Sequence, residues 1–106
     1  MNVRTATALL VDDDDASCQA TRRRLEDDGY TVLLARDAAD GLARARGSLP
    51  DVIFTHLIAG THGNVAFIQA LRSDDACRHV PVMVVTGLPE SGRRPKQLRA
   101  VGRNRW

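Results

Sequence analysis

Four short runs of aliphatic residues, separated by longer polar segments, set the pattern of this sequence. The runs predict strands over 6–11, 30–35, 51–55 and 80–87. Each run is continuously apolar instead of alternating between apolar and polar residues, which is typical of parallel strands whose two faces are both buried. The sequence therefore predicts a sheet that is covered on both sides.

Helices are predicted between these strands. The first begins at a capping aspartate, Asp14 or Asp15, and ends near Gly29, because aspartate suits a helix N-cap and glycine suits the residue after a helix. Spacings of three and four residues give its buried face: Cys18, Thr21 and Leu25. This helix would connect the first two strands.

Two further helices are expected over 37–47 and 64–73. The first of these is capped by Asp37 and weakened by Gly41. The second has one apolar face, made of Val65, Ile68 and Leu71. A weak helix is also expected from about 95 to 101. The alternation of strands and helices predicts an α/β fold, a doubly wound parallel sheet with helices on both faces.

Length and composition narrow the class of protein. The 106 residues suit one small domain, and with 43% hydrophobic and 4% aromatic residues its core should be mainly aliphatic. Cys18 and Cys77 lack the close spacing of a disulfide framework or a zinc site and fit a reducing cytoplasm. No apolar run approaches a membrane span and no signal peptide is evident. We therefore expect a cytoplasmic protein.

Charge divides the chain into an acidic body and a basic tail. Residues 1–86 carry a net charge of −3 and residues 87–106 a net charge of +5. A tail of this kind can bind nucleic-acid phosphates without sequence specificity. However, Trp106 is its single aromatic residue and it has no recognisable DNA-binding motif. A solvated linker is the preferred interpretation, and nucleic-acid binding is an alternative.

Polar side chains stand at the ends of three predicted strands. Asp12 and Asp13 follow the first strand, His56 ends the third, and Thr86 ends the fourth. The carboxyl ends of parallel strands meet at one edge of the sheet, where ligands bind in open α/β folds. We therefore expect two acids, a histidine and a hydroxyl to converge there.

The segments around these ends resemble a known family. "LLVDDDD", "PDVIFTHL" and "VPVMVVTG" resemble, in order and register, the landmarks of a response-regulator receiver domain of two-component signalling, and "EDDGYTV" resembles its first helix-to-strand junction. The resemblance implies a flavodoxin-like receiver fold with strand order 2-1-3-4-5, here with the last strand and helix missing or incomplete. The receiver-like core would span 1–88. Residues 89–106 would form the basic tail, with a partial fourth helix and the start of the fifth strand.

The resemblance also implies a mechanism. In this family an aspartate at the end of the third strand accepts a phosphoryl group from a histidine kinase. Two acids after the first strand hold Mg²⁺, helped by a backbone carbonyl two residues past the acceptor, while a hydroxyl and a lysine bind the phosphoryl oxygens. The matching positions are Asp12 and Asp13 for the acids, Ile58 for the carbonyl, Thr86 for the hydroxyl and Trp106 for the switch aromatic.

Two of the positions that depart from the family pattern bear directly on its chemistry. The acceptor position holds His56, and the lysine position falls beyond Trp106, because Lys96 comes too early in the chain. An acyl phosphate needs a carboxylate oxygen as nucleophile. Mg²⁺ prefers hard oxygen ligands, whereas imidazole suits zinc, copper or nickel. Mg²⁺ binding is therefore expected to weaken, and no cofactor is expected.

Two further roles for the histidine stay open. One is phosphorylation of the imidazole itself. The other is a transition-metal site made of Asp12, Asp13 and His56, with His62 as a further ligand.

These features predict a receiver-like domain without enzyme activity that has lost its phosphoacceptor and acts through protein–protein contacts. Its partner would be a histidine kinase or an output domain. A missing last helix would leave one sheet face bare, so a homodimer or a downstream segment is expected to cover it. One alternative is a sensor regulated by metal or ligand at the Asp12, Asp13 and His56 edge. Another is a nucleic-acid-associated protein acting through the tail.

Overall fold

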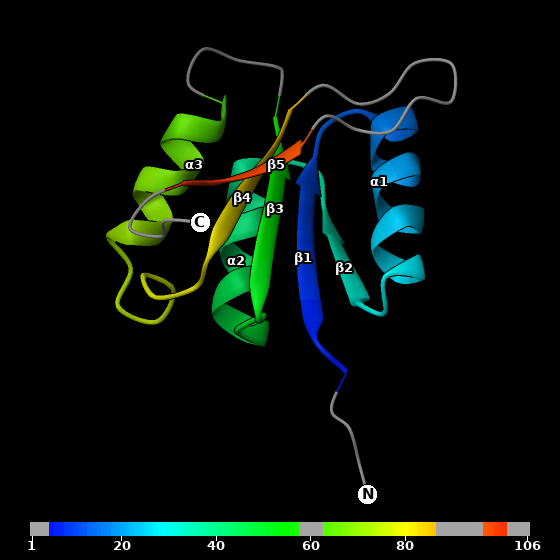
Figure 1. The fold of residues 1–106 in the computed structure, drawn as a ribbon. Helices are drawn as coiled ribbons and strands as arrows, with labels where there is room; N and C mark the ends of the chain where they lie inside the picture. Colours follow the sequence, from blue (N-terminus) through cyan, green and yellow to red (C-terminus); the bar gives the residue numbers. More distant parts are fainter. Residues whose placement is uncertain (1–4, 58–62, 87–96, 102–106) are drawn as a thin grey trace, which may run out of the picture.

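The computed structural model describes residues 5–57, 63–86 and 97–101, with the backbone alone for Thr86 and the last segment. These residues form a five-stranded sheet and three helices (Figure 1). The strands in chain order are β1 (Thr7–Asp12), β2 (Thr31–Ala35), β3 (Val52–His56), β4 (Val82–Thr86) and β5 (Gln97–Val101). Their order across the sheet is β2-β1-β3-β4-β5.

The first four strands run parallel, as their apolar runs predict. β1 pairs with β2 on one side and with β3 on the other, and β3 pairs with β4. The predicted α/β class and the strand order 2-1-3-4 are confirmed. The register places Asp12 directly opposite His56 at the carboxyl ends of β1 and β3.

Each helix connects two successive parallel strands. The helices are α1 (Asp15–Asp27), α2 (Ala38–Ser48) and α3 (Gly63–Arg72). The side chain of Asp14 caps α1 and that of Asp37 caps α2, each by accepting a backbone amide of the first turn. Gly29 follows α1 with a φ of 102°, a conformation that glycine adopts without strain. Both caps and the terminating glycine confirm the predictions.

None of the helices in the described residues has both the length and the hydropathy that crossing a membrane requires.

Two apolar clusters cover the two faces of the sheet. Successive residues of β1 point to opposite sides, so Leu9 and Val11 pack with α2 and α3 while Ala8 and Leu10 pack with α1. Figure 1 shows α2 behind the sheet. Among the described helices, α1 alone lies on its face, where it contacts β1 and β2.

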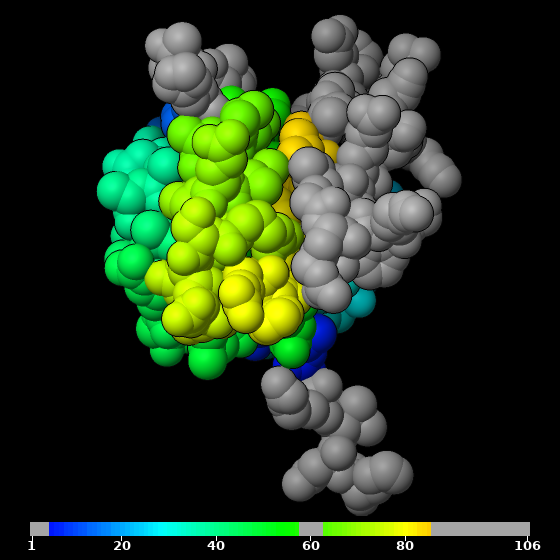
Figure 2. Space-filling view, turned by 90° about the vertical axis from the view of Figure 1, so that its left-hand side faces the viewer, coloured from blue at the N-terminus to red at the C-terminus, as the bar shows by residue number. Residues whose placement is uncertain are grey.

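The buried face of α3 differs from the predicted one. Phe67 and Leu71 are buried and Ile68 is partly buried, whereas Val65 is 59% exposed. Residues 65–68 of α3 are all apolar, so spacing alone does not select a face there, and the large Phe67 side chain is the one that is buried in the core. Figure 2 shows α3 along one side of the molecule, where its outward residues meet solvent.

Gly41 was expected to weaken α2, and the packing of the core explains why a glycine stands there. A Cβ atom at this position would lie 3.0 Å from both the Phe67 ring and the Val11 side chain. The Phe67 ring therefore occupies the space that a side chain at position 41 would need. The cost in helix propensity is offset by this contact between α2 and α3.

The last strand differs from the predictions in two ways. The helix predicted from about 95 to 101 is wrong for Gln97–Val101, because this segment forms β5. The sheet was predicted to be parallel, but β5 runs antiparallel to β4. Only residues 87–96 separate β4 from β5, and a parallel connection needs a crossover of about a dozen residues or more. An antiparallel strand still pairs the outer backbone groups of β4, which would otherwise form an open edge.

Candidate functional site

The carboxyl ends of β1 and β3 bring an acid and an imidazole together. Asp12 is fully buried, and the side chain of His56 is 19% exposed. The Nδ1 atom of His56 lies 3.5 Å from the Oδ2 atom of Asp12. The predicted meeting of these two side chains at one sheet edge is therefore observed. The site is closed on the protein side and opens to solvent at the imidazole.

A third residue, Ser17, bridges the pair. Its hydroxyl oxygen lies 2.6 Å from Oδ2 of Asp12 and 2.8 Å from Nδ1 of His56. Ser17 lies in the first turn of α1 and is buried. A helix that starts directly after a strand turns its first side chains back over the strand end. This short spacing from Asp12 was the available signal, but the sequence reasoning did not use it.

The direction of these hydrogen bonds follows from the protons available. An ionised carboxylate only accepts hydrogen bonds, and a serine hydroxyl has one proton to donate. The Ser17 hydroxyl therefore donates to Asp12 and accepts from the Nδ1–H of His56. This assignment leaves the lone pair of a neutral imidazole on Nε2, the nitrogen not engaged by Ser17.

The second oxygen of Asp12 is also occupied. Its Oδ1 atom accepts a hydrogen bond of 2.9 Å from the amide of Asp14. Asp14 in turn caps α1 by accepting the amide of Ser17 at 2.8 Å. A hydrogen bond to a charged group is stronger than a neutral one. These contacts fix the Asp12 carboxylate in a single orientation.

The remaining acids of the run have different surroundings. Asp13 is partly buried, and Asp14 and Asp15 are exposed. Asp15 forms an ion pair with Arg36 at 3.0 Å, on the surface. The interpretation of Asp14 as a helix cap is confirmed, and Asp15 is a solvated first-turn acid that favours the start of α1.

The chain beyond His56 is held by an amide side chain that the sequence did not single out. The Oδ1 atom of Asn64 accepts the Thr55 hydroxyl at 2.8 Å and the Leu57 amide at 2.9 Å. Asn64 thereby ties the end of β3 to the start of α3. It holds the Thr55 side chain before His56 and the Leu57 backbone after it.

Several expected members of the site lie outside the described residues. These are Ile58, His62 and Trp106, together with the side chain of Thr86; Lys96, which was not assigned to the site, also lies outside them. The backbone of Thr86 ends β4, two strands away from Asp12, and pairs with Gln97. The roles of Ile58, Thr86 and Trp106 stay predictions that rest on the family resemblance, and the role of His62 as a metal ligand stays a prediction from its residue type.

The donor set does not fit the Mg²⁺ ion that the family resemblance implies. Both oxygens of Asp12 accept protein hydrogen bonds, and an imidazole nitrogen stands where an oxygen ligand is needed. Within the described part of the chain, no three His, Cys, Asp or Glu side chains are grouped to hold a metal ion. Asp12, Asp13 and His56 are all described, so this arrangement does not support the predicted transition-metal alternative either.

A thiol lies next to this network. Cys18 is buried, and its burial raises the pKa of the thiol, as does the nearby Asp12 carboxylate. Burial also raises the pKa of Cys77, on the other face of the sheet. Both cysteines are free, as predicted. A raised pKa lowers the fraction of thiolate, so both thiols are poor nucleophiles at neutral pH.

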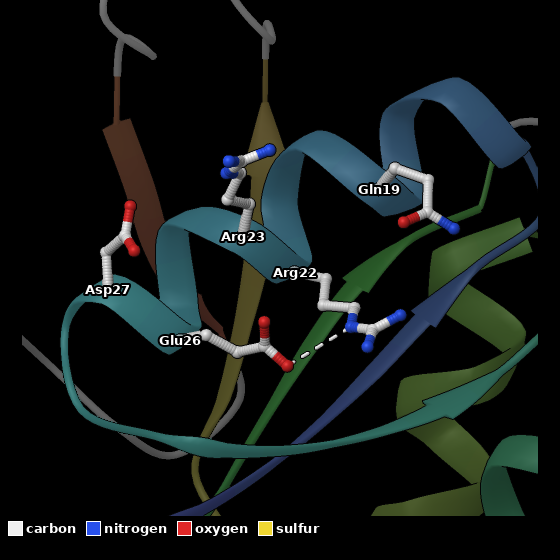
Figure 3. A pocket seen from close by; sticks show the side chains of 5 residues that line it. All are labelled: Gln19, Arg22, Arg23, Glu26 and Asp27. Atoms are coloured by element: carbon white, nitrogen blue, oxygen red, sulfur yellow. Dashed lines mark hydrogen bonds and ion pairs between the residues drawn. The ribbon is translucent and has the colours of Figure 1, made fainter.

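A shallow hollow lies on the outward face of α1, away from the network. The side chains that line it are Gln19, Arg22, Arg23, Glu26 and Asp27 (Figure 3). Arg22 and Glu26 form an ion pair of 3.1 Å across one helical turn. Charged residues of both signs at helical spacing are typical of a solvated helix surface.

Comparisons with known proteins add evidence from outside the chain. The family model of the response regulator receiver domain matches residues 8–102. The response regulator PleD of Caulobacter vibrioides is 31% identical over 94 residues, which are 89% of this chain and 21% of PleD. The polar-differentiation response regulator DivK of Brucella anthropi is 27% identical over 86 residues, 81% of this chain and 70% of DivK. The chain thus spans about a fifth of the length of PleD.

Solved structures share the fold. The chemotaxis response regulator CheY4 of Vibrio cholerae is 28% identical, with a TM-score of 0.69 over 76% of this chain and 68% of that one. The N-terminal domain of a response regulator receiver protein from Methanoculleus marisnigri JR1 has a TM-score of 0.72 over 82% of this chain and 71% of that one. At 23% identity the second likeness shows the fold alone.

Proposed function

The chain belongs to the response-regulator receiver family, and from this premise we propose that it is a degenerate receiver domain that is not phosphorylated at position 56. Receiver domains are signalling modules of two-component systems. One observation carries the proposal: the acceptor position holds a histidine whose imidazole is hydrogen bonded to Ser17 and lies beside Asp12.

The chemistry of phosphorylation supports this conclusion. The family reaction uses a carboxylate oxygen as nucleophile, and His56 has none. Replacing a carboxylate by a neutral imidazole also removes one anion beside the divalent cation. At a separation near 4 Å and an effective dielectric constant of 20, one such charge pair is worth roughly 4 kcal/mol. Mg²⁺ binding at this edge is thus disfavoured by charge as well as by ligand type.

The proposed role is a regulated or constitutive protein–protein contact without catalysis. The partner is a histidine kinase or an output domain, the two classes with which receiver domains interact. The two unpaired thiols fit a reducing compartment, and we place the domain in the cytoplasm. The activities of the much longer PleD are not carried over.

A phosphorylation assay tests the proposal. The wild-type chain and the His56→Asp variant are incubated with acetyl phosphate and Mg²⁺, and their intact masses are measured. The wild-type chain should keep its mass, because no carboxylate occupies position 56. An added phosphoryl mass on the wild-type chain would overturn the proposal. A phosphoryl group gained at position 56 by the variant would support the assignment of the site.

We further propose that the domain associates through the sheet face that carries α1. In the described residues α1 contacts β1 and β2, while Val52 of β3 and Met83 of β4 are partly exposed apolar residues on the same face, beside the buried Phe54 and Val85. Sedimentation velocity over a range of concentrations should detect a dimer. A monodisperse monomer that binds no hydrophobic dye would contradict association through this face.

A further inference from the structure

We propose that Ser17 closes the acidic site to divalent cations, by occupying the Asp12 carboxylate and by holding His56 in one tautomer. The inference rests on the proposed loss of phosphorylation at position 56 and names a second residue that contributes to it. Ser17 acts through Asp12 and His56, so it is a positioning residue. On this inference both Ser17 and His56 oppose the binding of a cation at this site.

The geometry at Asp12 supports this role. Oδ2 accepts the Ser17 hydroxyl at 2.6 Å, and Oδ1 accepts the Asp14 amide at 2.9 Å. A cation approaching Oδ2 would meet the positive end of the hydroxyl dipole and would have to break this bond. Asp12 is fully buried and Ser17 is 8% exposed, so the packing around them restricts rotation of the hydroxyl away from the carboxylate.

The contact between Ser17 and Asp12 does not depend on the imidazole. Ser17 is positioned by α1, whose cap uses the Ser17 amide and the Asp14 side chain. A His56→Asp variant therefore supplies a third carboxylate but leaves Oδ2 of Asp12 occupied. Removing the hydroxyl as well would free that oxygen for a cation, while the capping hydrogen bond to the backbone amide remains.

The test measures Mn²⁺ affinity, by the electron paramagnetic resonance signal of the free ion, for four chains: wild type, Ser17→Ala, His56→Asp and the double variant. The double variant should bind Mn²⁺ about tenfold more tightly than His56→Asp alone, since one hydrogen bond to a charged group is no longer broken on binding. Equal affinities of these two variants would overturn the inference.

A matched control removes a different hydroxyl from the same helix. Thr21 lies one turn after Ser17 and is buried, and in the described structure its hydroxyl has no hydrogen-bond partner. Thr21→Ala combined with His56→Asp should bind Mn²⁺ as His56→Asp does. If it gains affinity as Ser17→Ala does, general loosening of α1 is the cause and the inference fails. Circular dichroism confirms that each variant is folded.

A measurement without metal tests the tautomer. The ring nitrogens of ¹⁵N-labelled His56, recorded at mildly alkaline pH, should report the Nδ1–H tautomer in the wild type and a mixture in Ser17→Ala. A wild-type ring with its proton on Nε2 would overturn the inference. A phosphoryl mass on the wild-type chain would refute the proposed function and leave this result standing. Equal Mn²⁺ affinities would refute the role of Ser17 and leave the proposed function standing.

Discussion

At the scale of single residues, Asp12 is the most constrained charge of the described chain. It is fully buried among further acids, and its two oxygens accept the Ser17 hydroxyl and the Asp14 amide. A buried charge is tolerated when its hydrogen bonds are made, and removing one partner leaves the others unsatisfied. The network is therefore a structural element as well as a closed site.

Asp12→Ala should lower the free energy of unfolding by about 1–3 kcal/mol, because the Ser17 hydroxyl and the Asp14 amide lose their acceptor. Asp15→Ala is the control, since Asp15 makes an exposed ion pair with Arg36 and should change stability by less than about 1 kcal/mol. Urea unfolding measures both. A stability gain in Asp12→Ala would mean that repulsion within the acidic run outweighs the network.

The pairing of Asp12 with His56 was predictable, because both follow apolar strands whose carboxyl ends must meet in a parallel sheet. Ser17 was not predicted. Its helical position indicates which way the residue faces, but a pattern of apolar residues does not show which polar atoms a hydroxyl will reach. The same holds for Asn64, which binds the Thr55 hydroxyl and the Leu57 amide across a loop.

At the scale of elements, α2 packs on α3 through Gly41. Gly41→Ala gains up to about 1 kcal/mol of helix propensity. However, its Cβ would lie 3.0 Å from the buried Phe67 ring and from Val11, and overpacking costs about 1–3 kcal/mol. The variant should therefore be destabilised overall.

Gly47→Ala is the matched control in the same helix. No atom lies within 4 Å of a Cβ built at position 47, so the propensity gain is not opposed and the variant should be stabilised by up to about 1 kcal/mol. Thermal unfolding compares the two variants. Equal effects at both positions would contradict the packing explanation for Gly41.

The end of α2 is joined to the turn after α3 by Arg46 and Asp74, whose Nε and Oδ2 atoms lie 2.5 Å apart. The hydrogen bond from Arg46 holds the pKa of Asp74 below its ordinary value, helped by the amides of Ala76 and Cys77. A lowered folded-state pKa contributes stability that is complete above the unfolded-state pKa, about 3.9. That contribution is lost as the pH falls through the lower, folded-state value.

Asp74→Asn should therefore flatten the fall in stability below about pH 4, compared with the wild type. Asp75→Asn is the control, since Asp75 is fully exposed and lies 4.0 Å from Arg78. Urea unfolding at a series of pH values measures both. An unchanged pH profile in Asp74→Asn would show that the contact with Arg46 does not perturb the carboxyl in solution.

Element boundaries were well predicted where a cap marked them, as at Asp14 and Asp37, and poorly where only apolar spacing was available. In α3 residues 65–68 are all apolar, and Phe67 is buried in place of Val65 because Gly41 leaves space for its ring. In β5 the local preference for a helix was overridden by the unpaired edge of β4. Both outcomes depend on tertiary contacts that a local pattern does not contain.

At the scale of the whole molecule, the sheet separates two apolar clusters, and each contains one cysteine. Cys18, a residue of α1, packs against the sheet on one face, and Cys77 lies in the cluster of α2 and α3 on the other. The continuous apolar strands predicted this two-sided burial from sequence.

The two thiols should react at least about tenfold more slowly in the native protein than in urea, because both are buried and their pKa values are raised. If the domain unfolds as one unit, both should become reactive at the same urea concentration. Alkylation followed by peptide mass mapping distinguishes the sites. Reaction of Cys18 well below the concentration that exposes Cys77 would show that the α1 face opens separately.

The claim that the acidic edge takes neither Mg²⁺ nor a phosphoryl group is tested most directly by the amide spectrum of the ¹⁵N-labelled wild-type chain. The spectrum is recorded before and after addition of Mg²⁺ and acetyl phosphate. The amide signals of Asp12, Asp13, Ser17 and His56 should not move beyond the shift that added salt causes elsewhere. A saturable shift of these signals would contradict the account.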